Sequence, residues 1–131
     1  MRHYENPEKT SENRCLPRSW YIPGGVSRRL LLNGDWQFAY FTRDVDVPET
    51  ITAWDTIPVP SCWQLQGYEH PNYSNINYPY PCDPPYVPDE TPVGVYDRDF
   101  ILPAAFRGRK TVLRFDGVSS CYYAYVNGQL A

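Results

Sequence analysis

The fold class of this chain is decided by the stretch Asn33-Gly34-Asp35-Trp36-Gln37-Phe38-Ala39-Tyr40. After the turn signal Asn33-Gly34, aromatic side chains occupy every second position, at Trp36, Phe38 and Tyr40. Residues two apart lie on the same face of an extended chain, so this pattern predicts a half-buried β-strand. Short strands separated by turn signals predict an all-β protein built as an antiparallel sandwich. The other expected strands are at residues 54–59, from Gly94 through Leu102, at 111–115 and at 121–126.

Composition excludes several classes of protein. The chain has 131 residues, of which 42% are hydrophobic and 16% aromatic, which suits one domain and argues against disorder. Its 14 prolines disfavour a helical bundle. The net charge of −3 includes no basic block, so nucleic acid is not an expected partner. No apolar run reaches the roughly 18 residues of a membrane span. Residues 1–15 lack the apolar centre of a signal peptide, so we expect a cytoplasmic location and no membrane partner.

Two segments are expected along the chain. Residues 1–28 are polar and interrupted by prolines, which is typical of an extended N-terminal arm, although a disordered terminus explains the same composition. Residues 29–131 carry the strand signals and, at residues 61–92, a long proline-rich loop of the kind that is commonly functional. Asn127-Gly128 predicts a hairpin whose returning strand is missing before Ala131. We therefore expect a C-terminally incomplete sandwich from a longer protein; the alternative is that residues 128–131 are only a tail.

Candidate catalytic groups are few. Asp97 and Asp99 share one strand face at about the 5–5.5 Å separation that a retaining glycosidase requires. That face is opposite the aromatic one, so a solvated edge is the preferred interpretation. No nucleophile motif or phosphate-binding loop occurs, so we expect neither an independent active site nor a cofactor in this chain. The cysteines match no zinc spacing, so free thiols and no metal site are expected; they are Cys15, Cys62, Cys82 and Cys121.

The loop between Trp63 and Tyr86 gives the sharpest binding hypothesis. Planar rings stack on the C–H faces of sugars, and amides supply the donors and acceptors that hydroxyl groups require. Carbohydrate contact is one interpretation; packing of the loop on its own sandwich is the other, and composition alone favours it. The residues concerned are Trp63, Tyr68, Tyr73, Tyr78, Tyr80 and Tyr86, with Gln64, Gln66, Asn72, Asn75 and Asn77.

Five motifs follow one another along the chain. Residues 32–38 read L-N-G-D-W-Q-F, residues 59–68 read V-P-S-C-W-Q-L-Q-G-Y, and residues 73–79 read Y-S-N-I-N-Y-P. Residues 115–120 read F-D-G-V-S-S and residues 126–128 read V-N-G. In this order the motifs resemble the first domain of the family 2 glycoside hydrolases. The tyrosine-proline segment resembles the β-galactosidase branch of that family.

The resemblance implies a fold and a division of labour. Residues 29–131 would form a galactose-binding-like jelly roll that precedes immunoglobulin-like domains and a catalytic TIM barrel. The barrel would hold the two catalytic glutamates, Mg and Na. The parent protein would be a β-galactosidase that hydrolyses terminal non-reducing β-D-galactose residues with retention, and the chain alone would be inactive. Asn75 would contact the galactosyl group, with Ile76 beside it in the substrate-binding site.

The partners implied by the resemblance are a β-galactoside, the remaining domains of the polypeptide and further copies in a homo-oligomer. Two other functions stay open on the residues alone. One is a free-standing carbohydrate-binding module, and the other is a structural domain whose arm and loop serve only subunit assembly. Sugar binding by the chain itself separates these two.

Overall fold

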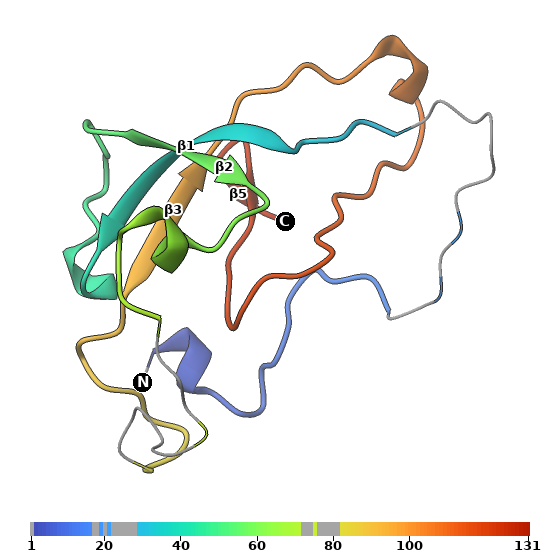
Figure 1. Ribbon diagram of the computed structural model, residues 1–131. Coiled ribbons are helices and arrows are strands. Elements are labelled where there is room, and N and C mark those ends of the chain that lie inside the picture. Colours follow the sequence, from blue (N-terminus) through green and yellow to red (C-terminus); the bar gives the residue numbers. More distant parts are fainter. Residues whose placement is uncertain (1, 17–18, 20, 22–28, 72–74, 76–81) are drawn as a thin grey trace. The chain divides into compact units, whose positions relative to one another are not determined.

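The computed structural model describes residues 2–16, 19, 21, 29–71, 75 and 82–131. The regular elements within these ranges are short strands and single 3-10 turns (Figure 1). None of these turns exceeds four residues, and all strand pairs are antiparallel, so the expected all-β, antiparallel class is confirmed. The chain divides into two compact units, one of Leu31–Ile101 and one of Met1–Leu30 with Leu102–Ala131.

A three-stranded antiparallel sheet forms the Leu31–Ile101 unit. Its central strand is β1 (Gly34–Phe41), between β2 (Asp55–Val59) and β3 (Val93–Asp97) (Figure 1). Trp36 lies opposite Ile57, and Phe38 lies opposite both Asp55 and Tyr96. The strands predicted from the alternation at residues 34–40 and from residues 54–59 are therefore confirmed.

Arg98 fixes the point where β1 begins. Its Nη1 atom donates to the carbonyl oxygens of Leu32 at 2.8 Å and of Asn33 at 3.1 Å. The Trp36 indole donates to the same Leu32 oxygen at 2.7 Å, and the Arg98 guanidinium lies 5.8 Å from the centre of the Trp36 ring. One cation thus satisfies two carbonyls that precede the strand and covers its first aromatic side chain.

The core of this unit is small and centres on Phe38. Phe38 and Ile57 have no exposed surface, and Ala39 is 8% exposed. The Phe38 ring meets the Tyr68 ring edge-on at 4.7 Å and the Tyr96 ring at 4.8 Å, separations at which aromatic pairs attract. Side chains on both faces of β1 are buried at this point, since Phe38 and Ala39 point to opposite sides of the sheet.

The absence of a side chain at Gly94 leaves the space on the sheet that the Trp63 ring fills. A Cβ atom at position 94 would fall on the six-membered ring of Trp63 and would lie 2.7 Å from Phe38 Cε2. Trp63 opens η3 (Trp63–Gln66), a 3-10 turn that ends at Gly67 with a φ of 91°. The left-handed Gly67 reverses the chain, and the Tyr68 amide then donates to the Trp63 carbonyl at 3.3 Å. The turn therefore returns both Trp63 and Tyr68 to the Phe38 side of β1.

The connection from β1 to β2 contains η2 (Asp44–Asp46). Arg43 donates from Nε and Nη2 to the two carboxylate oxygens of Asp46, both at 2.6 Å. This bidentate pair is exposed and contributes little to stability, because water competes for both charges.

The other unit contains a two-residue hairpin turn. β4 (Tyr125–Val126) pairs with β5 (Gln129–Leu130), and the turn residues Asn127 and Gly128 have φ values of 51° and 77°. Positive φ at both positions defines the type I′ turn that Asn-Gly favours, so the predicted hairpin is confirmed. The expectation that its returning strand is missing was wrong, because Gln129 and Leu130 supply a short one.

Three predicted strands end early or are absent. The ladder between β1 and β3 stops at the Gln37–Asp97 pair, so β3 does not continue to Leu102. Residues 111–115 form no strand, and of residues 121–126 only the last two do. Alternation predicts which side chains share a face, but a strand also needs a neighbour to receive its hydrogen bonds. The turn expected between Pro103 and Gly108 is present as η4 (Ala104–Phe106).

The N-terminal residues contact the C-terminal ones within their shared unit. η1 (His3–Glu5) is held by the Arg2 amide, which donates to the Glu5 carboxylate at 2.8 Å, and Glu5 is buried. The Asn13 amide donates to the Leu130 carbonyl at 3.2 Å, and the His3 ring lies 5.9 Å from the Tyr123 ring.

Gly94→Ala is expected to lower the free energy of unfolding by at least about 1–3 kcal/mol, because the added methyl group overlaps the Trp63 and Phe38 rings. Gly117→Ala is the matched control, since a Cβ there meets no atom within 4 Å, and it should change stability by less than about 0.5 kcal/mol. Urea unfolding of the two variants measures the difference. Equal midpoints would contradict the packing of Trp63 on Gly94.

Candidate functional site

Five aromatic side chains gather on one side of the sheet. Tyr40 joins the group because it lies two residues from Phe38 on β1, and its ring centre is 6.0 Å from those of Trp63 and Tyr68. We call this group the aromatic face; its members are Phe38, Tyr40, Trp63, Tyr68 and Tyr96. Trp63 and Tyr68 come from the loop that follows β2, so for these two residues the packing interpretation is confirmed.

Polar groups rim the aromatic face. One carboxylate oxygen of Glu69 accepts from Trp63 Nε1 at 3.3 Å and from Gln64 Nε2 at 3.2 Å. The Cys62 thiol donates to the Gln64 side-chain oxygen at 2.7 Å. The Tyr68 hydroxyl donates to the Asp55 carboxylate at 3.0 Å. The rim thus satisfies the indole N–H and the amide that border the apolar rings.

The tyrosines of the aromatic face hold their protons tightly. Burial raises the pKa of Tyr40 above its ordinary value of 10.0, and the nearby Glu69 charge raises it further. Burial and the hydrogen bond to Asp55 raise the pKa of Tyr68, and burial raises the pKa of Tyr96. All three therefore remain neutral hydroxyl groups at physiological pH and do not serve as bases.

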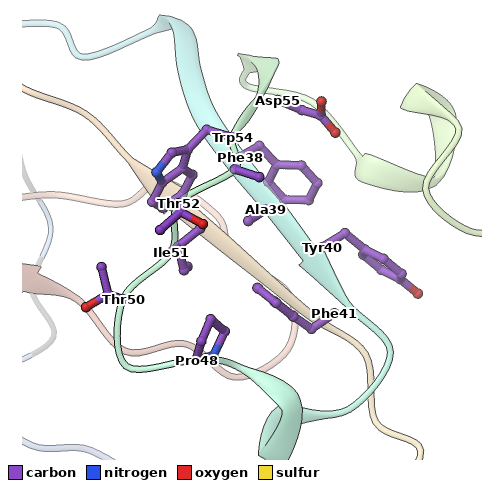
Figure 2. Close-up of a pocket in the computed structure, with 11 residues that line it drawn as sticks. Phe38, Ala39, Tyr40, Phe41, Pro48, Thr50, Ile51, Thr52, Trp54 and Asp55 are labelled. Carbon is purple, nitrogen blue, oxygen red and sulfur yellow. The ribbon is translucent and has the colours of Figure 1, made fainter.

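A shallow depression of about 480 Å³ lies along β1 and the connection to β2. Figure 2 shows this connection, from Pro48 to Asp55, running beside the strand. Its lining is mainly apolar, with Phe41, Ile51 and Trp54, and its polar groups include the hydroxyls of Thr50 and Thr52 and the Asp55 carboxylate. Such a lining offers apolar contact but no pair of carboxylates for acid–base chemistry.

Of the two residues predicted to bind substrate, the structure describes one. Asn75 is described and lies exposed in a turn, whereas Ile76 lies outside the described residues. Tyr73, Tyr78 and Tyr80 also lie outside them. Asp97 and Asp99 are exposed, which agrees with the interpretation of a solvated edge.

Sequence reasoning missed Glu69 and the role of Gly94. The only sequence clue to Glu69 was its position directly after the motif at residues 59–68. A charged side chain in such a loop would normally be assigned to solvent. The signal for Gly94 was a glycine inside a strand pattern, which marks a close approach of another group.

Metal-ligating side chains do not cluster in the described part of the chain. Within the described ranges, no three His, Cys, Asp or Glu residues come together as a metal site would require. Among the same residues, all four cysteines are free thiols with exposed positions. No helix within the ranges given above is long and apolar enough to cross a membrane.

Residues 30–131 match the family described as Glycosyl hydrolases family 2, sugar binding domain, and the chain belongs to this family. The family resemblance of the motifs is therefore confirmed. Its relatives include the beta-galactosidases of Yersinia pestis bv. Antiqua (strain Angola) and of Yersinia pseudotuberculosis serotype O:3 (strain YPIII). Each is 42% identical to the chain over 144 residues, which cover 98% of the chain and 14% of the relative. The chain thus spans about 14% of the length of the curated relatives it matches.

Raising the pH above about 10 is expected to destabilise the aromatic face. The folded state holds the phenolic protons of Tyr40, Tyr68 and Tyr96 more tightly than the unfolded chain does. Their contribution to stability is complete below the ordinary pKa of 10.0 and is lost as the pH rises through the higher folded-state pKa values.

Tyr40→Phe keeps the ring and has no proton to lose. Its free energy of unfolding should therefore fall less steeply with pH than that of the wild type, by up to about one proton. Urea unfolding of both proteins at about pH 8 and about pH 11 measures this slope. The same loss of stability in both proteins would show that burial of Tyr40 does not control its ionisation.

Proposed function

We propose that this chain is the N-terminal, non-catalytic domain of a β-galactosidase that hydrolyses terminal non-reducing β-D-galactose residues with retention. The observation that carries the proposal is the 42% identity to the Yersinia beta-galactosidases along 98% of the chain. Retention requires two carboxyl groups about 5–5.5 Å apart. The proposal assigns this pair, together with Mg and Na, to a separate catalytic domain of the parent protein.

The proposal includes a jelly-roll fold for residues 29–131 and an extended arm for residues 1–28. The face of the sheet opposite Phe38 carries Phe41, Val93 and Val95, all half-buried. Residues after Leu102 leave further apolar side chains exposed: Val112 is 51%, Leu113 39% and Phe115 40% exposed. An apolar sheet face needs a second layer to cover it, which favours a sandwich over a single open sheet.

Asn75, with Ile76 beside it, is proposed to contact the galactosyl group at the rim of the active site. Asn75 is exposed, and its side-chain amide can donate to one hydroxyl and accept from another. An aliphatic side chain at position 76 would lie against the C–H surface of the sugar. Neither residue carries out the chemistry; both would select and orient the sugar for the catalytic pair.

The partners in this proposal are the β-galactoside, the other domains of the parent polypeptide and further copies of it in a homo-oligomer, in the cytoplasm. The family description, a sugar-binding domain, favours one competing function, a carbohydrate-binding module that works without a barrel. The two functions differ in what the chain does alone. A module binds galactosides with useful affinity by itself, whereas a rim loop needs the rest of the active site.

In the complete enzyme, Asn75→Ala is expected to weaken galactoside binding about three- to tenfold, because one hydrogen bond to an uncharged hydroxyl contributes about 0.5–1.5 kcal/mol. If the contact strengthens in the transition state, the loss appears in kcat as well as KM. Steady-state kinetics on a galactoside and on its 2-deoxy analogue measure the loss and identify the hydroxyl concerned.

Gln37→Ala is the control for this experiment, since it removes an exposed amide from β1, outside the loop concerned, and should leave the kinetics unchanged. The 131-residue chain, assayed beside the complete enzyme, should show no turnover. Identical kinetics for Asn75→Ala and the wild type on both substrates would remove Asn75 from the substrate site. Turnover by the pure chain would overturn the non-catalytic assignment.

A further inference from the structure

Asn13 binds the backbone of β5 on the edge that faces away from β4. The Ala131 amide donates to the Ala124 carbonyl at 2.8 Å, so these two residues form a hydrogen-bonded pair. Such pairs alternate along an antiparallel ladder with pairs that share no hydrogen bond. Leu130, opposite Tyr125, therefore directs its backbone N–H and C=O outward. The Asn13 side-chain amide donates to this outward carbonyl at 3.2 Å, where the next strand of a sheet would bind.

The segment that carries Asn13 is held together by contacts of its own. We call residues 2–13 the N-terminal strap. The Glu12 carboxylate lies 2.7 Å from the Lys9 ammonium nitrogen and 3.8 Å from His3 Nε2, so it joins the two ends of the strap. The His3 ring also lies 5.9 Å from the Tyr123 ring. The strap thus contacts the C-terminal residues at two points, one near its beginning and one at its end.

The hairpin that the strap contacts lacks the usual protection of an edge strand. Charged side chains and prolines are what commonly keep an edge from pairing with another chain, and residues 117–131 contain neither. They are instead rich in tyrosine and β-branched residues, and in β4 Tyr125 is 62% and Val126 40% exposed. An uncharged segment of this kind pairs readily with a second copy of itself. Covering the edge with another segment of the chain is the remaining protection.

We infer that the N-terminal strap is an edge cover, which through Asn13 occupies the outer edge of β5 and so prevents a second copy of this chain from adding a strand there. A second copy is the expected competitor because two identical edges are self-complementary about a two-fold axis. The strap also brings charges to an edge that has none, since Lys9 and Glu12 are exposed. This role is independent of the galactosidase function proposed above.

Asn13→Asp is the variant that tests the cover. Asn13 has a φ of 55°, a left-handed conformation that Asp also adopts, so the backbone is kept. The carboxylate cannot donate to Leu130 and repels its carbonyl oxygen. Thr10→Asp is the matched control, because it adds the same charge at an exposed position of the strap and leaves the Asn13 contact in place.

Sedimentation velocity of the 131-residue chain over a concentration series measures self-association. Asn13→Asp should associate at a concentration at least about threefold lower than the wild type, since the loss of one hydrogen bond uncovers the edge more often by about that factor. Thr10→Asp should associate as the wild type does. Hydrogen exchange locates the contact: peptides from residues 122–131 should exchange faster in dilute, monomeric Asn13→Asp and become protected when it associates.

If Asn13→Asp does not fold, Asn13→Gly takes its place, because glycine keeps the left-handed conformation and has no amide side chain to donate. Association of the Asn13 variant at the wild-type concentration would overturn the inference, as would equal association of Thr10→Asp and Asn13→Asp. Association that protects other peptides and leaves residues 122–131 unprotected would equally overturn it, because the copies would then meet at a different surface.

Discussion

The packing of the Trp63 ring on the bare backbone of Gly94 is the contact on which the described sheet depends. The ring occupies the space of an absent Cβ and lies beside Phe38, the fully buried centre of the core. η3 and the left-handed Gly67 bring Trp63 to this place, and Tyr68 follows it onto the same face. The aromatic face and the rim that includes Glu69 follow from it.

The sequence predicted where strand β1 forms, but not where β3 ends or that residues 111–115 form no strand. The alternation at Trp36, Phe38 and Tyr40 located β1 because a strand's period of two is a property of the chain itself. The end of β3 at Asp97 and the absence of a strand at residues 111–115 depend on whether a neighbour is present. The sequence does not state this, because strand pairing is a long-range contact.

The residues of the candidate site were likewise predicted only in part from the sequence. Asn75 was identified through a motif resemblance, and the family it implied is confirmed by the match of residues 30–131. Glu69 was missed because its partners, Trp63 and Gln64, reach it only when the 3-10 turn forms and Gly67 reverses the chain. Charged residues in loops are usually solvated, so composition gave no reason to assign Glu69 a structural contact.

One NMR measurement, of the glycine Hα protons, tests the packing of Trp63 on Gly94 most directly. The indole ring current must displace the Gly94 Hα resonances from those of the other glycines, and Gly94→Ala assigns them by their disappearance. We predict that Trp63→Leu returns these resonances to ordinary positions, whereas Trp36→Leu, which removes the indole at the start of β1, leaves them displaced. Gly94 Hα resonances at ordinary positions in the wild type, or unmoved by Trp63→Leu, would contradict the account.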